Sequence, residues 1–241
     1  MPRDHDALLK PPDQSKHDDP VRGTFITFEG IDGCGKSTQM RMIASKLRVR
    51  GLEVVTTREP GGTSLGKRIR TVLLDPLTEV DPLTELLLFA ADRAQHVRTL
   101  LRPAIAAGNI VFSDRYADAT AAYQGAGRNF TSKVISDVIA LATEGLKPDL
   151  TLIFDVPVAE CLSRTVRRTE GENKTDRLDA EDAAFHTRVR NAYLELAAAE
   201  PNRIRIIDAS GPVNETHGKV VDLIFPFLES RGRVLAAEEG Q

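Results

Sequence analysis

The sequence predicts an α/β protein built on a five-stranded parallel sheet with helices on both faces. Short apolar stretches alternate along the chain with longer segments whose apolar residues recur at helical spacing, as expected when strands are joined by crossover helices. The stretches cover about residues 24–28, 52–57, 110–113, 150–155 and 204–207. Polar residues follow each stretch, and open sheets of this class bind ligands at the carboxyl ends of their strands. We therefore expect one ligand cleft at that edge.

The composition restricts the class of partner. A chain of 241 residues with 41% hydrophobic content can form one large α/β domain. Its net charge of −3 gives no basic footprint for nucleic acid. Two cysteines and five scattered histidines form neither a disulfide framework nor a metal cluster, and no segment resembles a secretion signal or a membrane span. We expect a cytoplasmic protein with small-molecule partners, and neither nucleic acid nor membrane as a partner.

The ends of the chain differ in character from its middle. Residues 1–20 are rich in proline and charge and carry almost no apolar run, so we expect a disordered leader. Residues 21–230 form a single predicted domain, and 231–241 a flexible tail. A helical segment with several arginines leads into the polar stretch 169–177. This pattern favours a short mobile lid at about 165–180, with a solvated charged surface as the alternative.

One motif carries most of the chemical information. Gly30-Ile-Asp-Gly-Cys-Gly-Lys-Ser37 fits the phosphate-binding loop G-x-x-x-x-G-K-[ST], and it lies between an apolar strand stretch and a segment of helical spacing. Its glycines let backbone N–H groups turn toward a polyphosphate, Lys36 reaches the β and γ phosphates, and Ser37 can ligate Mg²⁺. Asp114 closes a later apolar strand and is the expected carboxylate ligand of that Mg²⁺. The motif predicts a nucleotide-binding enzyme.

Two further segments allow more than one interpretation. Phe89 and Arg93 are four residues apart in the helical segment 82–101, so one planar ligand could contact both. Periodicity alone favours Phe89 as a core residue and Arg93 as a surface charge. The small-residue stretch 120–128, which carries Tyr123 and Gln124, is compatible with lining a ligand cleft or with a flexible connector, and without other signals the connector is favoured.

The order of several motifs makes the chain resemble the thymidylate kinases, P-loop nucleoside monophosphate kinases that phosphorylate dTMP. The resemblance spans residues 22–228 and is carried by Phe28-Glu-Gly-Ile-Asp-Gly-Cys-Gly-Lys-Ser-Thr38, Thr57-Arg-Glu-Pro-Gly-Gly-Thr63, Leu88-Phe-Ala-Ala-Asp-Arg-Ala-Gln95, Asp114-Arg-Tyr116, Ala122-Tyr-Gln-Gly125 and Asp176-Arg-Leu178. It implies a P-loop kinase fold with a short mobile lid, a homodimer, and transfer of the γ-phosphoryl group of ATP to dTMP with Mg²⁺ as cofactor. A kinase for another deoxynucleotide such as dUMP, or a non-catalytic nucleotide sensor, are the alternatives.

The resemblance also implies roles for individual residues. The ATP-binding loop comprises Gly30, Ile31, Asp32, Gly33, Cys34, Gly35, Lys36, Ser37 and Thr38. The dTMP site comprises Asp32, Glu59, Pro60, Arg70, Phe89, Arg93, Arg115, Thr120, Tyr123 and Gln124. In similar enzymes the phenylalanine stacks on thymine, the arginine and glutamine contact its edge, the loop aspartate binds the 3′-OH, and the arginine at position 115 holds the acceptor phosphate.

The same resemblance assigns the catalytic and metal groups. The catalytic residues are Lys36, Arg115, Asp32 and the lid arginines Arg164 and Arg168, and the metal ligands are Ser37 and Asp114. The eukaryotic-like branch carries an arginine in the phosphate loop, where this chain has Gly33. The chain is therefore similar to the bacterial type, whose catalytic arginine comes from the lid.

Overall fold

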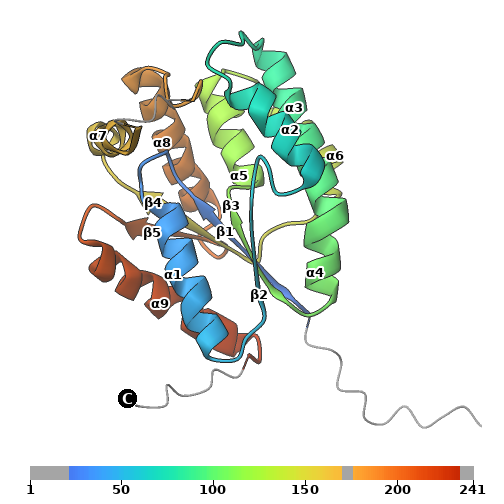
Figure 1. Ribbon diagram of the computed structural model, residues 1–241, viewed down its shortest axis with the longest axis vertical. Helices are drawn as coiled ribbons and strands as arrows, with labels where there is room; N and C mark the ends of the chain where they lie inside the picture. The colour runs from blue at the N-terminus through green and yellow to red at the C-terminus, as the bar shows by residue number, and fades with distance from the viewer. Residues whose placement is uncertain (1–21, 170–175, 234–241) are drawn as a thin grey trace, which may run out of the picture.

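The computed structural model describes residues 22–169 and 176–233 (Figure 1). Its centre is a five-stranded sheet in the order β2-β3-β1-β4-β5, in which neighbouring strands are parallel. The strands are β1 (Thr24–Glu29), β2 (Val54–Arg58), β3 (Ile110–Asp114), β4 (Leu150–Asp155) and β5 (Ile204–Asp208). The predicted α/β class is confirmed.

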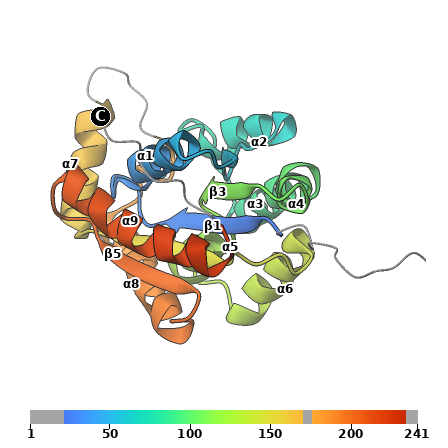
Figure 2. The same ribbon diagram turned by 90° about the horizontal axis from the view of Figure 1, so that it is seen from below.

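Helices connect the strands and cover both faces of the sheet (Figure 2). The α-helices are α1 (Lys36–Val49), α2 (Ser64–Leu74), α3 (Pro82–His96), α4 (Arg102–Ala106), α5 (Ala117–Thr120), α6 (Ser132–Thr143), α7 (Val158–Thr169), α8 (Ala183–Ala199) and α9 (Val213–Ser230). Two π-helical segments, η1 (Val97–Leu101) and η2 (Ala121–Gly127), continue α3 and α5. Among the described residues, no helix is both long enough and apolar enough to span a membrane.

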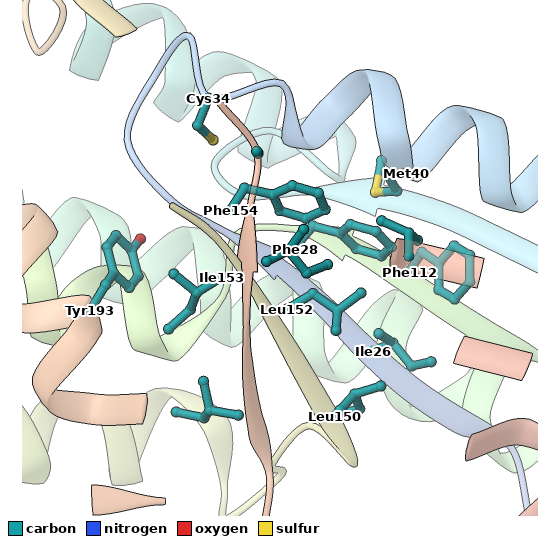
Figure 3. Packing of buried hydrophobic residues seen from close by; sticks show 14 of the residues in the cluster. Ile26, Phe28, Cys34, Met40, Phe112, Leu150, Leu152, Ile153, Phe154 and Tyr193 are labelled. Atoms are coloured by element: carbon teal, nitrogen blue, oxygen red, sulfur yellow. The ribbon is translucent and has the colours of Figure 1, made fainter. Parts of the chain in front are cut away.

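Alternating side chains of the strands divide the core between the two faces. On one face Phe28 packs against Phe112 and Phe154, with ring centroids 5.2 and 5.9 Å apart, and Met40 of α1 lies beside them (Figure 3). On the other face Phe25 packs with apolar side chains of η1 and α4. Near-continuous apolar strands of this kind are what a sheet buried on both sides requires.

Three segments differ from the prediction. Helix α6 was not predicted, because the side chains of Val134 and Leu141 are exposed and blur the periodicity of a helix that buries Ile135 and Ala142. The apolar spacing of residues 220–228 predicts a final helix, but helix α9 begins earlier, at Val213, and it contains Pro226. The stretch 120–128 is helical rather than a flexible connector, because α5 and η2 pack it against α8 and α6.

Several predictions fall on the ends of the chain and on the lid. The predicted leader 1–20 and residues 234–241 of the predicted tail lie outside the described residues. The predicted lid includes residues 170–175, which are also outside them. The lid therefore stays a prediction.

The sheet register brings three strand ends together. Phe28 and Arg58 both pair with Asp114, so β1, β2 and β3 end at the same level. The phosphate loop, the Arg58-Glu-Pro-Gly-Gly turn and the Asp114-Arg-Tyr turn begin there. Residues far apart in the sequence thus meet at the carboxyl edge, where ligands of such sheets bind.

Candidate functional site

A cavity of about 600 Å³ opens at the carboxyl edge of the sheet, a size that accommodates small molecules. Most of the residues predicted for the site line it: Asp32, Gly33, Gly35, Lys36, Ser37, Thr38, Glu59, Pro60, Arg70, Phe89, Arg93, Asp114, Arg115, Thr120, Tyr123, Gln124 and Arg164. The phosphate loop and the predicted base-binding residues thus share one space.

Four predicted residues are not among those that line the cavity. Ile31 and Cys34 are buried in the hydrophobic core, so they contribute backbone and packing rather than side-chain contacts. A Cβ at Gly30 would lie 2.7 Å from the Phe154 carbonyl oxygen, and its φ of 135° also favours glycine. The side chain of Arg168 lies outside the described residues.

The phosphate loop ends where α1 begins. Lys36 Nζ lies 3.4 Å from Asp32 Oδ1 and 3.9 Å from Asp114 Oδ1. Burial and Arg115 act to lower the pKa of Lys36, but Asp32 and Asp114 outweigh them and raise it, so the amine stays charged. No acidic residue lies in the first turn of α1, which leaves the positive end of the helix dipole free for an anion.

Gly33 packs directly against the helix α7. A Cβ at this position would lie 2.3 Å from the Cys161 carbonyl oxygen, and the φ of Gly33 is 83°. Glycine is therefore required here for two reasons, the left-handed backbone and the close approach of another chain segment. The loop and α7 are therefore in direct contact beside the cavity.

Arg115 is held at the centre of the cavity in an unusual backbone conformation. Its φ is 74°, which few residues other than glycine adopt. Its Nη2 donates to Asp32 Oδ2 at 2.7 Å and to the Tyr123 hydroxyl at 2.9 Å. Burial acts to raise the pKa of Asp32, but the charges of Arg115 and Lys36 outweigh it and lower that pKa. Asp32 is therefore ionised and aligns two cations.

Glu29 supports this turn from beneath the sheet edge. Its Oε1 accepts from the backbone N–H of Tyr116 at 2.7 Å, immediately after Arg115, and its Oε2 accepts from the Tyr193 hydroxyl at 2.8 Å. Arg115 Nη1 in turn donates to that hydroxyl at 3.4 Å. Complete burial, reinforced by Asp118, raises the pKa of Glu29 to about 8. Sequence reasoning missed this role, because the Tyr193 contact spans 164 positions.

Arg93 is buried rather than a surface charge. The residue as a whole is 1% exposed, and three of its nitrogens donate to Glu59 Oε2, Thr120 Oγ1 and the Tyr116 carbonyl at 2.7 to 2.8 Å. The other Glu59 oxygen lies 2.8 Å from His96 Nδ1. Glu59 therefore borders the cavity mainly as the group that fixes Arg93, and the surface-charge interpretation is wrong.

Phe89 and Gln124 lie at the same end of the cavity as Arg93. Phe89 is half-buried and lines the cavity instead of entering the core. Gln124 and Thr120 are each 1% exposed and project from the segment formed by α5 and η2. The Gln124 Nε2 donates to Glu85 Oε1 at 2.8 Å. A flat ring, a guanidinium and an amide thus face one space, which suits a planar heterocycle.

Basic side chains dominate the phosphate end of the cavity. Arg70 Nη1 donates to the Pro60 carbonyl at 3.1 Å, and Arg164 Nη2 lies 2.5 Å from Glu160 Oε1. Arg41 and Arg58 line the same cavity and were not assigned by sequence reasoning. The signal for Arg58 was available, since it begins the Arg-Glu-Pro-Gly-Gly turn at a strand end. This concentration of positive charge suits polyphosphates.

The predicted metal ligands are in contact with each other. The Ser37 hydroxyl donates to Asp114 Oδ2, so a hydroxyl and a carboxylate converge beside the phosphate loop. Within residues 22–169 and 176–233, no cluster of three or more His, Cys, Asp or Glu side chains suits a metal ion. Mg²⁺ bound with nucleotides takes one or two protein ligands and completes its shell with phosphate and water. The pair therefore fits Mg²⁺.

The chain is similar to known proteins over most of its length. A family model described as Thymidylate kinase matches residues 28–220. A thymidylate kinase of Deinococcus radiodurans is 47% identical over 199 residues, covering 83% of this chain and 95% of the relative. One of Exiguobacterium sibiricum is 43% identical over 215 residues, covering 89% of this chain and 100% of the relative. The crystal structure of the thymidylate kinase from Ehrlichia chaffeensis matches with a TM-score of 0.69 at 34% identity, covering 84% of this chain and 98% of that one. The chain therefore belongs to the thymidylate kinase family.

Proposed function

We propose that the protein transfers the γ-phosphoryl group of ATP to dTMP, giving ADP and dTDP. The observation that carries this proposal is the continuity of the cavity, which runs from Lys36 of the phosphate loop to Phe89, Arg93 and Gln124. Membership of the thymidylate kinase family supports the choice of substrates. Donor phosphates and an acceptor base can thus be held in one space, as direct transfer requires.

The acceptor would bind with its base against Phe89. Arg93, fixed by Glu59 and Thr120, would donate to the carbonyl edge of thymine, and Gln124 would complete the contact with that edge. The Tyr123 hydroxyl lies 3.4 Å from Asp32 Oδ2, and the sugar would be placed beside this pair. Arg115 would hold the acceptor phosphate after exchanging part of its contact with Asp32 for the new anion.

Transfer would depend on positioning and charge rather than on a base. The attacking phosphate oxygen of a nucleoside monophosphate is already anionic at neutral pH, so no side chain must deprotonate it. Lys36, Arg115 and Arg164 would gather the phosphates in line, and Arg168 is a further candidate from α7. Ser37 and Asp114 would hold Mg²⁺, which neutralises charge on the transferring phosphates when bound.

The test is acceptor-dependent release of ADP from ATP and Mg²⁺, with dTMP, dUMP, dCMP, dGMP or dAMP supplied separately. We expect kcat/KM to be highest for dTMP. Preference for dUMP or another monophosphate would leave a kinase with a different acceptor. Nucleotide binding without any acceptor-dependent ADP release would instead indicate a nucleotide sensor.

We also propose a homodimer formed through the surface of α2, α3 and α6. Exposed apolar side chains lie on all three helices. Helix α3 packs between the other two (Figure 2). The exposed residues are Leu65, Val72, Leu83, Leu87, Val134 and Leu141. On α3, Leu87 is 53% exposed, whereas its neighbour Leu86 is buried within its own subunit. Sedimentation should give a dimer for the native protein and a monomer for Leu87→Glu.

A cytoplasmic location completes the proposal. Cys34 and Cys161 are both buried, and both are free thiols rather than partners in a disulfide. Free thiols agree with a reducing compartment.

A further inference from the structure

Glu85 is a buried acidic residue at the base end of the cavity. It lies on α3 one turn before Phe89, and it is 0% exposed. Its Oε1 accepts from Gln124 Nε2 at 2.8 Å and from Arg128 Nε at 3.2 Å. Its Oε2 accepts from Arg128 Nη2 at 3.0 Å and lies 2.7 Å from Arg177 Nη2. Two arginines and one amide therefore share this carboxylate.

The protonation state of Glu85 determines what it can do to the amide. Burial acts to raise the pKa of Glu85, but hydrogen bonds from Arg128 and Gln124 outweigh it and lower that pKa. The group is thus ionised at neutral pH, and an ionised carboxylate accepts hydrogen bonds but cannot donate them. Only the NH₂ group of Gln124 can face it, so the orientation of this amide follows from its partner.

The carbonyl oxygen of the Gln124 amide is then the atom available to a bound ligand. Gln124 lines the cavity, and among residues 22–169 and 176–233 no group donates to its Oε1. With the nitrogen engaged by Glu85, the carbonyl oxygen is the atom that Gln124 presents to a bound base. Arg93 can only donate, so the cavity offers a planar ligand one acceptor and one donor.

We propose that Glu85 is a positioning residue that sets base specificity, by holding the Gln124 amide with its acceptor toward the base. The inference rests on the proposed function and refines it. Thymine and uracil carry a hydrogen at N3 and satisfy this acceptor, whereas cytosine carries a lone pair at N3 and opposes it. A buried pair of facing acceptors is disfavoured, because neither can be satisfied by water.

Glu85→Gln is the discriminating variant, since it preserves size and removes one acceptor. The introduced carbonyl oxygen is expected at the Oε2 position, which accepts from Arg128 Nη2 at 3.0 Å and lies 2.7 Å from the cationic Arg177 Nη2. Its NH₂ group will then face Gln124, whose amide must turn and present its own NH₂ to the base. We expect the ratio of kcat/KM for dTMP to that for dCMP to fall about tenfold or more. The ratio for dTMP to dUMP should stay unchanged, because these bases differ in a methyl group that Gln124 does not contact.

Glu181→Gln provides a matched control. The Glu181 carboxylate lies 2.6 Å from Arg128 Nη2, so this change also removes an acidic partner of that arginine. No described contact joins Glu181 to Gln124. The control should therefore keep the wild-type ratio for dTMP to dCMP.

The outcomes separate the inference from the proposed function. A folded Glu85→Gln protein that keeps the wild-type ratio for dTMP to dCMP would overturn the role of Glu85. So would a parallel fall in the ratio for dTMP to dUMP, which indicates general damage to the cavity. A wild-type protein that does not phosphorylate dTMP would instead overturn the proposed function. If the variant does not fold, hydrogen exchange of the Gln124 side-chain NH₂ in the wild type decides, with strong protection expected and rapid exchange contradicting the inference.

Discussion

Glu29 provides a quantitative prediction, because its pKa couples proton binding to folding. In the folded protein burial and Asp118 raise this pKa from its ordinary value of 4.5 to about 8, against the opposing effects of Arg115, Tyr193 and the bond from Tyr116. The carboxyl is therefore protonated in the folded protein at pH values where it is ionised in the unfolded chain. The contribution of Glu29 to the free energy of unfolding is therefore largest below pH 4.5, and this contribution is lost as the pH rises toward 8.

The size of the effect follows from the two pKa values. Each pH unit between them costs about 1.4 kcal/mol of unfolding free energy. Between about pH 5.5 and about pH 8.5, a pKa that moves from 4.5 to about 8 corresponds to a loss of about 3 kcal/mol. Glu29→Gln carries no titrating group at this position and should not show that loss.

The assay is urea unfolding of the wild type and Glu29→Gln, followed by circular dichroism across this pH range. Subtracting the two free energies removes the titration of groups that both proteins share. We expect the stability of the wild type relative to the variant to fall by about 3 kcal/mol as pH rises. A difference that stays constant within about 1 kcal/mol would refute the reasoning and show that Glu29 is ionised throughout.

Asp92→Asn serves as the control. Burial and Glu59 raise the pKa of Asp92 to about 6, so this group titrates at lower pH. Its substitution should change the slope of stability below about pH 6 and leave the slope above about pH 7 unchanged.

Three further predictions concern the phosphate loop and the base-binding end of the cavity. Lys36→Ala should lower kcat by about 100-fold or more while dTMP binding survives, since among the groups of the two nucleotides the amine would contact only the transferring phosphates; wild-type turnover would contradict this assignment. Arg93→Ala should raise the Kd of dTMP by about tenfold or more, as expected for a lost charged hydrogen bond, and leave that of ATP unchanged; equal losses in calorimetry would indicate a folding defect instead. Cys34 is 1% exposed, and burial raises the pKa of its thiol. Iodoacetamide should therefore not label Cys34 in the native protein, with or without ATP. Rapid labelling detected by mass spectrometry would contradict this and show an accessible thiolate.

The sequence was most informative where chemistry depends on local spacing. The phosphate loop places Lys36 and Ser37 by adjacency alone, and the ends of apolar strands indicated Asp114. Both signals are local, and the parallel sheet brings them together at one edge. The roles of Phe89 and Arg93 needed family resemblance, because helical spacing alone also fits a core residue and a surface charge.

The supporting contacts could not be predicted, because they join residues that are distant in sequence. Tyr193 reaches Glu29 across 164 positions, and Glu85 reaches Gln124 across 39. No spacing rule relates such pairs before the helices are packed. The contacts of Glu59 could not be predicted either. In the sequence its carboxylate is a candidate ligand for the substrate, but in the fold it pairs with Arg93 and His96.

The close approach of Gly33 to α7 limits where this chain could carry an arginine beside the bound phosphates. With the Cys161 carbonyl where a Cβ would have to stand, the phosphate loop has no room for an arginine at this position. A catalytic arginine carried by α7 would avoid this clash, and Arg164 of α7 lines the cavity. Replacing Gly33 with arginine would require the backbone of α7 to move away from the phosphate loop at the same time. An arginine in place of Gly33 alone would therefore clash with the Cys161 carbonyl oxygen.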